Sequence, residues 1–158
     1  MEAESAWQFW YTVRKAAAIL ERDAEAVITA ELGISFGQFM VLSAVDAHPG
    51  PLIQVAIAEH LGLTKATVSR LIEQGARQGW INVDPDPASR RSQLISLTDT
   101  GQTLVKQGDA ALKTCPLADL PALPEADIQA VTATLVQVVA SLRATERALP
   151  PARHTMGQ

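Results

Sequence analysis

The 158-residue sequence contains one cysteine, few aromatic residues and no long apolar run, and these shortages exclude several classes of protein. The single thiol, Cys115, excludes an intrachain disulfide and is compatible with a reducing compartment. No apolar stretch approaches the roughly 20 residues that a membrane-spanning helix needs, so no membrane partner is expected. The acidic, polar residues 1–5 are the opposite of a secretory signal peptide. We therefore expect a cytoplasmic protein.

The sequence also lacks the motifs that carry common enzyme and metal chemistry. It has no phosphate-cradling glycine loop, no nucleophile elbow and no paired carboxylates with a nearby histidine. Its three histidines, His48, His60 and His154, have no metal-ligand spacing among themselves or with an acidic cluster. The prediction is a protein that is not an enzyme and uses no cofactor or metal. Cys115 is interpreted as an ordinary thiol, with a redox-tuned role as the alternative.

Charge is low and unevenly distributed. The net charge is −4, but residues 64–91 hold five basic and three acidic residues, a local balance of +2 that leaves −6 for the remainder. Because charges are screened beyond about 8 Å at physiological salt, local charge governs attraction to phosphate. The acidic remainder would repel DNA from other faces of the molecule.

Apolar periodicity and turn residues divide the chain into helices and one hairpin. Helices are expected over about 6–31, from Ser35 onward, and over about 54–60, 64–78, 99–113 and 124–148. Ser35 and Gln38 form a capping-box pattern, and Gly33, Gly62 and Gly79 stand where helices should end. Residues 80–83 and 93–97 read as two strands. Asp84 and Asp86 are interpreted as turn formers in the proline-rich loop between them.

The helix predicted over 64–78 has two distinct faces. Val68, Leu71, Ile72 and Gly75 follow the spacing of a buried face, and Thr64 is the expected N-cap. The opposite face carries short polar residues at its start and basic residues further on, which favours contact with base edges and phosphates. The adjacent Arg90 and Arg91 at the hairpin tip are suited to a narrow minor groove. The predicted DNA-binding residues are Thr64, Lys65, Ala66, Thr67, Ser69, Arg70, Gln74, Arg77, Arg90 and Arg91.

Each of these residues also has a structural interpretation. Thr64, Thr67 and Ser69 would then be capping and surface residues. Arg70 would pair with Glu59 or Glu73, and the two wing arginines would form a solvated hairpin tip. The motif that surrounds them favours DNA contact for most of the set, with Gln74 and Arg77 the weakest members.

The first and last helices carry long apolar faces that a single small domain cannot bury. This predicts a homodimer whose interface includes Trp7, Trp10, Val13, Val131, Leu135, Val138 and Leu142. The aromatic cluster of Trp7, Phe9, Trp10 and Tyr11 is interpreted as interface core, and a ligand pocket is the less favoured alternative.

Three segments together resemble the MarR family of transcriptional regulators. Residues 35–42 are similar to the second-helix motif of the family, and residues 58–71 to its helix-turn-recognition helix. Residues 89–91 and 93–101 resemble the wing of the family, and the second segment includes the Leu97-Thr98-x-x-Gly101 sequence that follows the wing. With the flanking helices, the resemblance extends over about 6–148.

The resemblance implies a fold and a mode of action. The fold is mainly α with a small β-hairpin: a winged helix-turn-helix domain at about 35–98, flanked by dimerisation helices at about 6–31 and 99–148. Residues 1–148 would form one unit, and 149–158 a flexible tail. Family members bind pseudo-palindromic double-stranded DNA as homodimers, mostly repress transcription, and in many cases release DNA when a small aromatic or phenolic effector binds between the two domains.

The sequence departs from the family pattern at three places. Ser89 stands where the family usually has an aspartate that braces the wing arginine, so the bracing of Arg91 would fall to Ser89 or Asp86. Gly75 replaces a large apolar residue, which costs the helix about 1 kcal/mol relative to alanine, and a loss of side-chain packing is expected in addition. No cysteine lies near the start of the chain, which excludes the peroxide-sensing subclass. The alternative functions are a winged-helix module that binds protein and a regulator that responds to no ligand.

Overall fold

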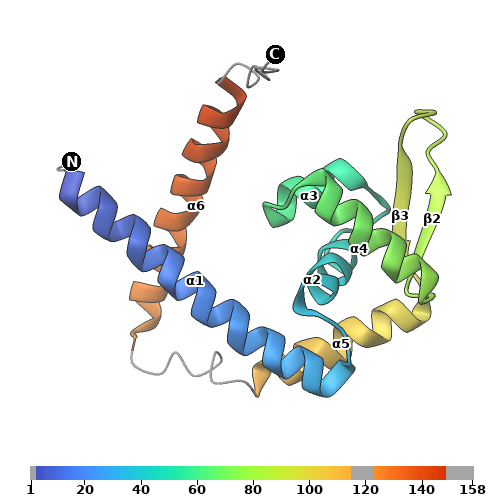
Figure 1. The fold of residues 1–158 in the computed structure, drawn as a ribbon, viewed down its shortest axis with the longest axis horizontal. Helices are drawn as coiled ribbons and strands as arrows, with labels where there is room; N and C mark the ends of the chain where they lie inside the picture. Colours follow the sequence, from blue (N-terminus) through green and yellow to red (C-terminus); the bar gives the residue numbers. More distant parts are fainter. Residues whose placement is uncertain (1–2, 115–122, 149–158) are drawn as a thin grey trace, which may run out of the picture. The chain divides into compact units, whose positions relative to one another are not determined.

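The computed structural model describes residues 3–114 and 123–148. The chain divides into two compact units, Met1–Asp119 and Leu120–Gln158, which we describe separately. The first unit contains α1 (Ala3–Leu32), α2 (Phe36–Asp46), β1 (Leu52–Ile53), α3 (Gln54–Leu61), α4 (Lys65–Arg77), β2 (Ile81–Pro85), β3 (Gln93–Leu97) and α5 (Asp99–Lys113). The second contains α6 (Glu125–Ala148) (Figure 1). The predicted mainly α architecture is confirmed.

Local capping sets most helix boundaries where the sequence predicts them. Ser35 and Gln38 form the capping box of α2, and the side chain of Thr98 accepts a hydrogen bond from the Gly101 N–H at the start of α5. Helices α1, α3 and α4 are followed by glycines with φ of 69° at Gly33, 66° at Gly62 and 75° at Gly79. These left-handed conformations favour glycine because its missing Cβ removes the steric penalty.

The sheet has three strands, whereas the sequence predicts two. The order is β1-β3-β2 with all pairs antiparallel, and β1 pairs Leu52 with Ile95 and Ile53 with Leu94. Because β1 contains two residues, it is too short to show the alternation by which a strand is predicted. β2 also extends to Pro85, so Asp84 lies in a strand and not in the turn.

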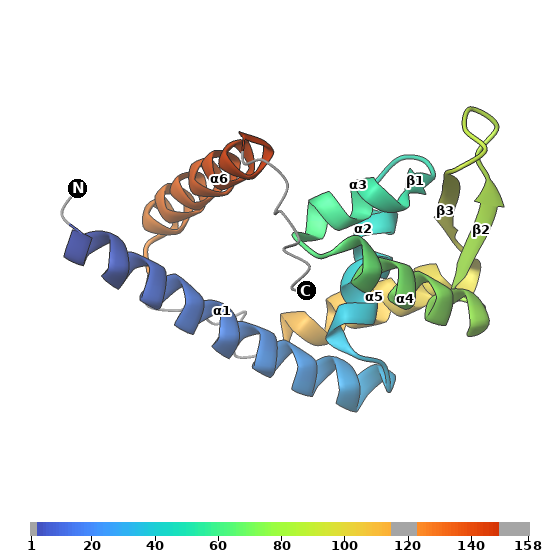
Figure 2. The ribbon, with the colours of Figure 1, turned by 45° about the horizontal axis from the view of Figure 1, so that its top comes forward.

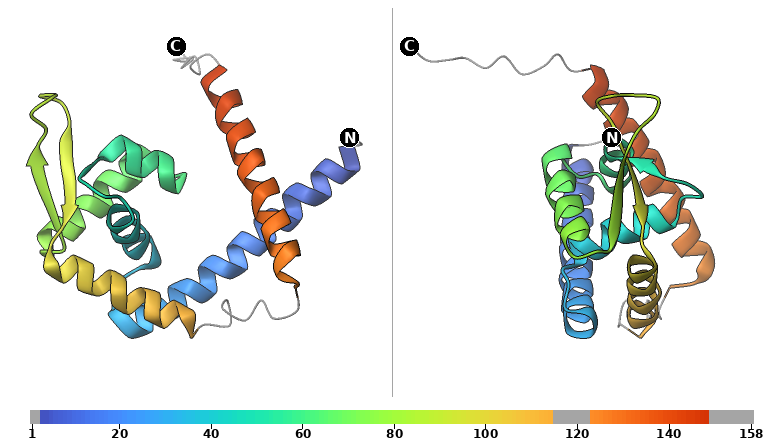
Figure 3. Two further views of the ribbon diagram at one scale, coloured as in Figure 1. Left: turned by 180° about the vertical axis from the view of Figure 1, so that it is seen from behind. Right: turned by 90° about the vertical axis from the view of Figure 1, so that its right-hand side faces the viewer.

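The core of the first unit lies between α2, α3, α4, α5 and the sheet. Its fully buried side chains include Phe39, Ile57, Val68 and Ile95, and Ile28 joins them from the C-terminal part of α1. Helix α5 packs closely on α2, because a Cβ at Gly108 would lie 2.2 Å from Cε2 of Phe39. The β2–β3 hairpin projects beyond the helices, with α4 beside its base (Figures 2 and 3).

Only the C-terminal part of α1 is buried in the first unit. Ala24 and Ile28 are 3% and 0% exposed, whereas every described side chain from Trp7 to Arg22 is exposed. In Figure 1 the N-terminal half of α1 extends away from α2 and α5. No single helix in the described ranges is long and apolar enough to cross a membrane, although α1 and α2, bent by 85°, meet that criterion as a pair.

Candidate nucleic-acid interface

The N-terminus of α4 is exposed and arranged to face an anion. Thr64 caps the helix: its Oγ1 accepts a hydrogen bond from the Thr67 N–H at 3.2 Å and lies 2.9 Å from the Thr67 hydroxyl. The first N–H groups of a helix have no intrahelical partner and attract phosphate. Lys65 and Ala66 are exposed at this end of the helix, and Thr67 is half-buried. Thr64 therefore has the capping role that the sequence predicts, on an accessible surface.

The outer face of α4 carries two exposed arginines, Arg70 and Arg77. Ser69 donates a hydrogen bond to Oε1 of Glu73 at 3.4 Å, and within residues 3–114 and 123–148 the Arg70 guanidinium has no ion-pair partner. The suggested pairing of Arg70 with Glu59 or Glu73 is thus absent. The Arg70 charge faces solvent next to short polar side chains.

The inner face of α4 holds the helix rigidly against the sheet. Val68, Leu71 and Ile72 are buried, and the Ile81 side chain from β2 occupies the space beside Gly75. A Cβ at Gly75 would lie 2.7 Å from Cδ1 of Ile81 and 3.2 Å from its Cγ1. The loss of packing expected at Gly75 is therefore wrong, because Ile81 fills the position that a larger residue would take.

The wing tip is a compact turn organised by Asp86. Its Oδ1 accepts from the Ala88 N–H at 2.9 Å, and its Oδ2 accepts from the Ser92 hydroxyl at 2.5 Å. The Ser92 hydrogen bond, followed by that of the Ala88 N–H, lowers the pKa of Asp86 below its ordinary value of 3.8. The turn-forming role predicted for Asp86 is confirmed.

Neither Ser89 nor Asp86, the two residues to which bracing of Arg91 would fall, holds the Arg91 guanidinium. Ser89 Oγ accepts from the Arg91 backbone N–H at 3.4 Å, and both oxygens of Asp86 bind other partners. Neither residue contacts the Arg91 guanidinium, because both are used to fold the loop backbone. Arg90 and Arg91 are exposed at the tip of a loop whose backbone is fixed.

The base of the wing is closed by the predicted exit motif. Thr98 Oγ1 donates to the Gly79 carbonyl at 2.7 Å, and the Thr98 N–H donates to the Trp80 carbonyl at 3.0 Å. A Cβ at Gly101 would lie 2.2 Å from the same Trp80 carbonyl oxygen, so only glycine permits this approach. The start of α5 is thereby joined to the end of α4, which positions the wing relative to the recognition helix.

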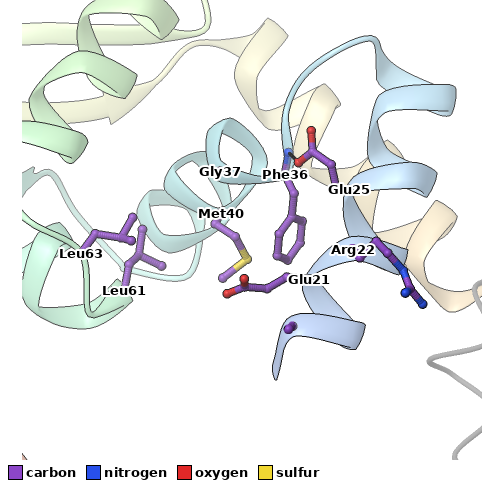
Figure 4. Close-up of a pocket in the computed structure, with 9 residues that line it drawn as sticks. Glu21, Arg22, Glu25, Phe36, Gly37, Met40, Leu61 and Leu63 are labelled. Atoms are coloured by element: carbon purple, nitrogen blue, oxygen red, sulfur yellow. Dashed lines mark hydrogen bonds between the residues drawn. The ribbon is translucent and has the colours of Figure 1, made fainter. Parts of the chain in front are cut away.

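A pocket lies between α1, α2 and the turn after α3 (Figure 4), in the region between domains where the resemblance implies an effector, although none of its lining residues was predicted. Its volume is about 520 Å³, and it is lined by Ala18, Glu21, Arg22, Glu25, Phe36, Gly37, Met40, Leu61 and Leu63. None of the four aromatic residues suggested as ligand contacts from the sequence lines it. The lining residues could not be predicted because they come from segments up to 45 residues apart and form no local motif.

The residues predicted for dimerisation present apolar side chains to solvent. On α1, Trp7 and Trp10 are 66% and 51% exposed and stack with ring centroids 4.9 Å apart. On α6, Val131 and Leu142 are 55% and 63% exposed, and Leu135 and Val138 are half-buried. Val13 is also exposed. Cys115 and residues 149–158 lie outside the described residues. No cluster of three or more metal-ligating residues is found among those that are described.

Helix, turn, recognition helix and arginine-tipped hairpin together define a winged helix-turn-helix protein. The family model described as "MarR family" matches residues 32–92, which include α2, α3, α4 and most of the wing. Two curated relatives match over 68 residues, or 43% of this chain. The HTH-type transcriptional repressor NicR of Pseudomonas putida is 29% identical over 42% of its length. The transcriptional regulator HosA of Escherichia coli O111:H- is 31% identical over 50% of its length.

The similarity to a solved structure extends further along the chain. The Staphylococcus aureus MepR–DNA complex has a TM-score of 0.73 and 25% identity, and the match covers 84% of this chain and 97% of that one. The match to the two curated relatives covers half of their length or less. Residues 32–92 thus match the MarR family, and the fold of the described residues is similar to that of a winged-helix protein bound to DNA.

Proposed function

We propose that this protein is a sequence-specific regulator of transcription that binds double-stranded DNA, and that it is not an enzyme. The observation that carries the proposal is the outer face of α4, where Arg70 has no partner among the described residues beside an exposed helix N-terminus. Helix α4 would enter the major groove, and Arg90 or Arg91 the adjacent minor groove. The DNA-bound state of the similar MepR supports this arrangement.

The protein would act as a homodimer on a pseudo-palindromic operator. The exposed apolar faces of α1 and α6 support this, because large apolar patches on a soluble protein mark interaction sites. In this proposal the winged helix at about 35–98 reads DNA, and helices at about 6–31 and 99–148 pair the two copies. Two recognition helices would then meet half-sites about 34–36 Å apart.

Repression with release by a small effector is the mode of regulation we favour. The name of the relative NicR supports repression, and the pocket of about 520 Å³ between α1 and α2 supports an effector. Pockets of about 300–1,000 Å³ accommodate small organic ligands. An occupant between the helix that joins the dimer and the domain that reads DNA would alter the spacing of the recognition helices. Such a regulator would work in the cytoplasm.

Fluorescence anisotropy on the DNA upstream of its own gene tests DNA binding directly. With excess random competitor, we expect saturable binding with a Kd near or below about 10 nM, weakening steeply between about 50 and 200 mM salt. The double variant Arg70→Ala and Arg91→Ala should abolish specific binding and leave the oligomeric state unchanged. Lys106→Ala removes an exposed positive charge from α5, outside the recognition helix and wing, and serves as the matched control.

Two results would count against the proposal. In the first, random competitor DNA abolishes binding to every fragment of a genomic DNA library. This result would favour a winged-helix module that binds protein. Equal loss of affinity in the Lys106→Ala variant would show that binding follows net charge and not the recognition helix.

A further inference from the structure

The pocket between α1 and α2 has one charged group that the described residues leave unpaired. Three ionisable side chains line it, Glu21, Arg22 and Glu25, all from α1. Glu21 has no hydrogen bond or ion pair with another described residue. Figure 4 shows its carboxylate turned toward Met40, beneath the ring of Phe36. The charge available to an occupant is therefore negative.

The other two charged groups are already engaged. The Arg22 guanidinium donates from Nε and from Nη2 to Oδ1 of Asp23, at 3.1 and 3.0 Å, and points away from Phe36 and Met40 (Figure 4). Glu25 Oε2 accepts from the Phe36 N–H at 2.6 Å, and its Oε1 accepts from the Thr29 hydroxyl at 3.2 Å. Glu25 thus joins α1 to the start of α2, and the Arg22 guanidinium is directed to Asp23 and not to Glu21.

The remaining walls favour an apolar body. Phe36, Met40, Leu61 and Leu63 contribute aromatic, thioether and aliphatic surface next to the Glu21 carboxylate. An aromatic face attracts cations through its quadrupole, and a methionine thioether adapts to aromatic ligands. A carboxylate ligand would instead meet the like charge of Glu21, and the one cation among the described lining residues, Arg22, pairs with Asp23.

We propose that the pocket binds aromatic cations, compounds with an apolar ring system and an ammonium-type group, and that Glu21 is the residue that selects for the positive charge. This inference rests on the proposed function, since it names the chemical class of the effector. The cation would lie between the Glu21 carboxylate and the Phe36 ring, with its rings against Met40 and Leu61.

Two ligands of matched shape and opposite charge test the proposal: 2-naphthylmethyl-trimethylammonium and 2-naphthylacetate. Binding is measured by isothermal titration calorimetry on the full-length protein, and release is measured by anisotropy on the DNA that it binds. We expect the cation to bind and the carboxylate to bind at least about tenfold more weakly. Glu21→Gln should weaken cation binding by about two- to fivefold, the range for an exposed charge pair. Glu31→Gln, also exposed on α1 but outside the pocket, should leave it unchanged.

The outcomes separate this inference from the proposed function. If the protein fails to bind DNA but binds the cation through Glu21, the proposed function fails and the pocket chemistry stands. If the protein binds DNA, binds the carboxylate more tightly than the cation, and loses carboxylate binding in the Arg22→Ala variant, the inference is overturned. Equal cation binding in wild type and Glu21→Gln also overturns it. Met40→Trp, which fills the pocket, should remove binding of the cation, and retained binding would place the ligand elsewhere.

Discussion

The Ile81 side chain occupies the space beside Gly75 that a larger residue at position 75 would fill. Glycine inside a helix lowers stability by about 1 kcal/mol relative to alanine, and the family usually has a large residue here. In this protein Ile81 lies against the bare helix backbone, with Cδ1 2.7 Å from the place of a Cβ. The sequence shows the glycine but not its partner, because the partner is identified only once α4 and β2 are packed together.

Gly75→Ala should lower the free energy of unfolding by up to about 2 kcal/mol. Overpacking against Ile81 costs about 1–3 kcal/mol, and the gain in helix propensity offsets about 1 kcal/mol of it. Ile81→Val removes the Cδ1 atom that the new methyl group would meet. In a double-mutant cycle followed by urea unfolding, Gly75→Ala should therefore cost less in the Ile81→Val background, with a coupling of about 0.5–2 kcal/mol. Strictly additive effects would contradict the contact.

Asp86 and Ser92 give the wing turn a dependence on pH. Because hydrogen bonds lower the pKa of Asp86 in the folded protein, this carboxylate stabilises the folded wing at every pH above its unfolded value of 3.8. The contribution is lost as pH falls below 3.8 through the folded pKa. Ser92→Ala removes the larger cause, so an NMR titration of the Asp86 carboxyl carbon should show its pKa rising toward 3.8. Ser96→Ala, on β3 opposite Asn82, is the control and should leave the titration unchanged.

At the scale of elements, the sequence predicts what is decided locally. The caps at Ser35, Thr64 and Thr98 act within three residues, and the structure has all three. β1 and the residues that line the pocket depend on segments distant in sequence, and neither was predicted. The turn at Asp86 is predicted in part. The residue type predicts a turn, but the sequence does not show that the carboxylate accepts from Ser92 and not from an arginine, because this depends on how the loop folds.

Thr98→Val should destabilise the base of the wing by about 1–2 kcal/mol. The variant keeps the shape of the side chain but removes the hydroxyl that accepts from Gly101 N–H and donates to the Gly79 carbonyl. Hydrogen exchange should show loss of protection at the amides of β2 and at the start of α5. Thr103→Val is the matched control on the same helix, since its hydroxyl donates only to the Asp99 carbonyl one turn before it. Equal effects of the two variants would contradict a special role for Thr98.

At the scale of the molecule, the proposed DNA-binding residues and the exposed apolar residues lie on different elements. The exposed cations Arg70, Arg77, Arg90 and Arg91 lie on α4 and the wing. Large exposed apolar side chains lie on the N-terminal half of α1 in the first unit and, separately, on α6 in the second. This division follows from the sequence pattern, because amphipathic periodicity in a helix that its own domain leaves uncovered predicts a partner.

Removing the stacked tryptophans should weaken the dimer. The double variant Trp7→Ala and Trp10→Ala deletes two large exposed aromatic surfaces. Aromatic residues at the centre of an interface commonly contribute about 2–4 kcal/mol to binding. Analytical ultracentrifugation should show a dimer dissociation constant at least about 30-fold higher in this variant than in wild type. Val55→Ala, an exposed apolar residue on α3, should leave the equilibrium unchanged. A monomeric wild type would contradict the pairing role of α1.

The hydrogen bonds from Thr98 to Gly79 and Trp80 bridge the hairpin below its strands, and the β2–β3 ladder bridges it along its length. A single cut by a protease at the arginine-rich tip would therefore sever the chain without separating its halves. The two fragments would remain one folded body, with the recognition helix on one fragment and α5 on the other. Such a nicked protein would keep the exposed apolar side chains of α1 and lose the fixed geometry of its wing arginines. A break at the tip would therefore preserve the fold and abolish the proposed contact with the minor groove.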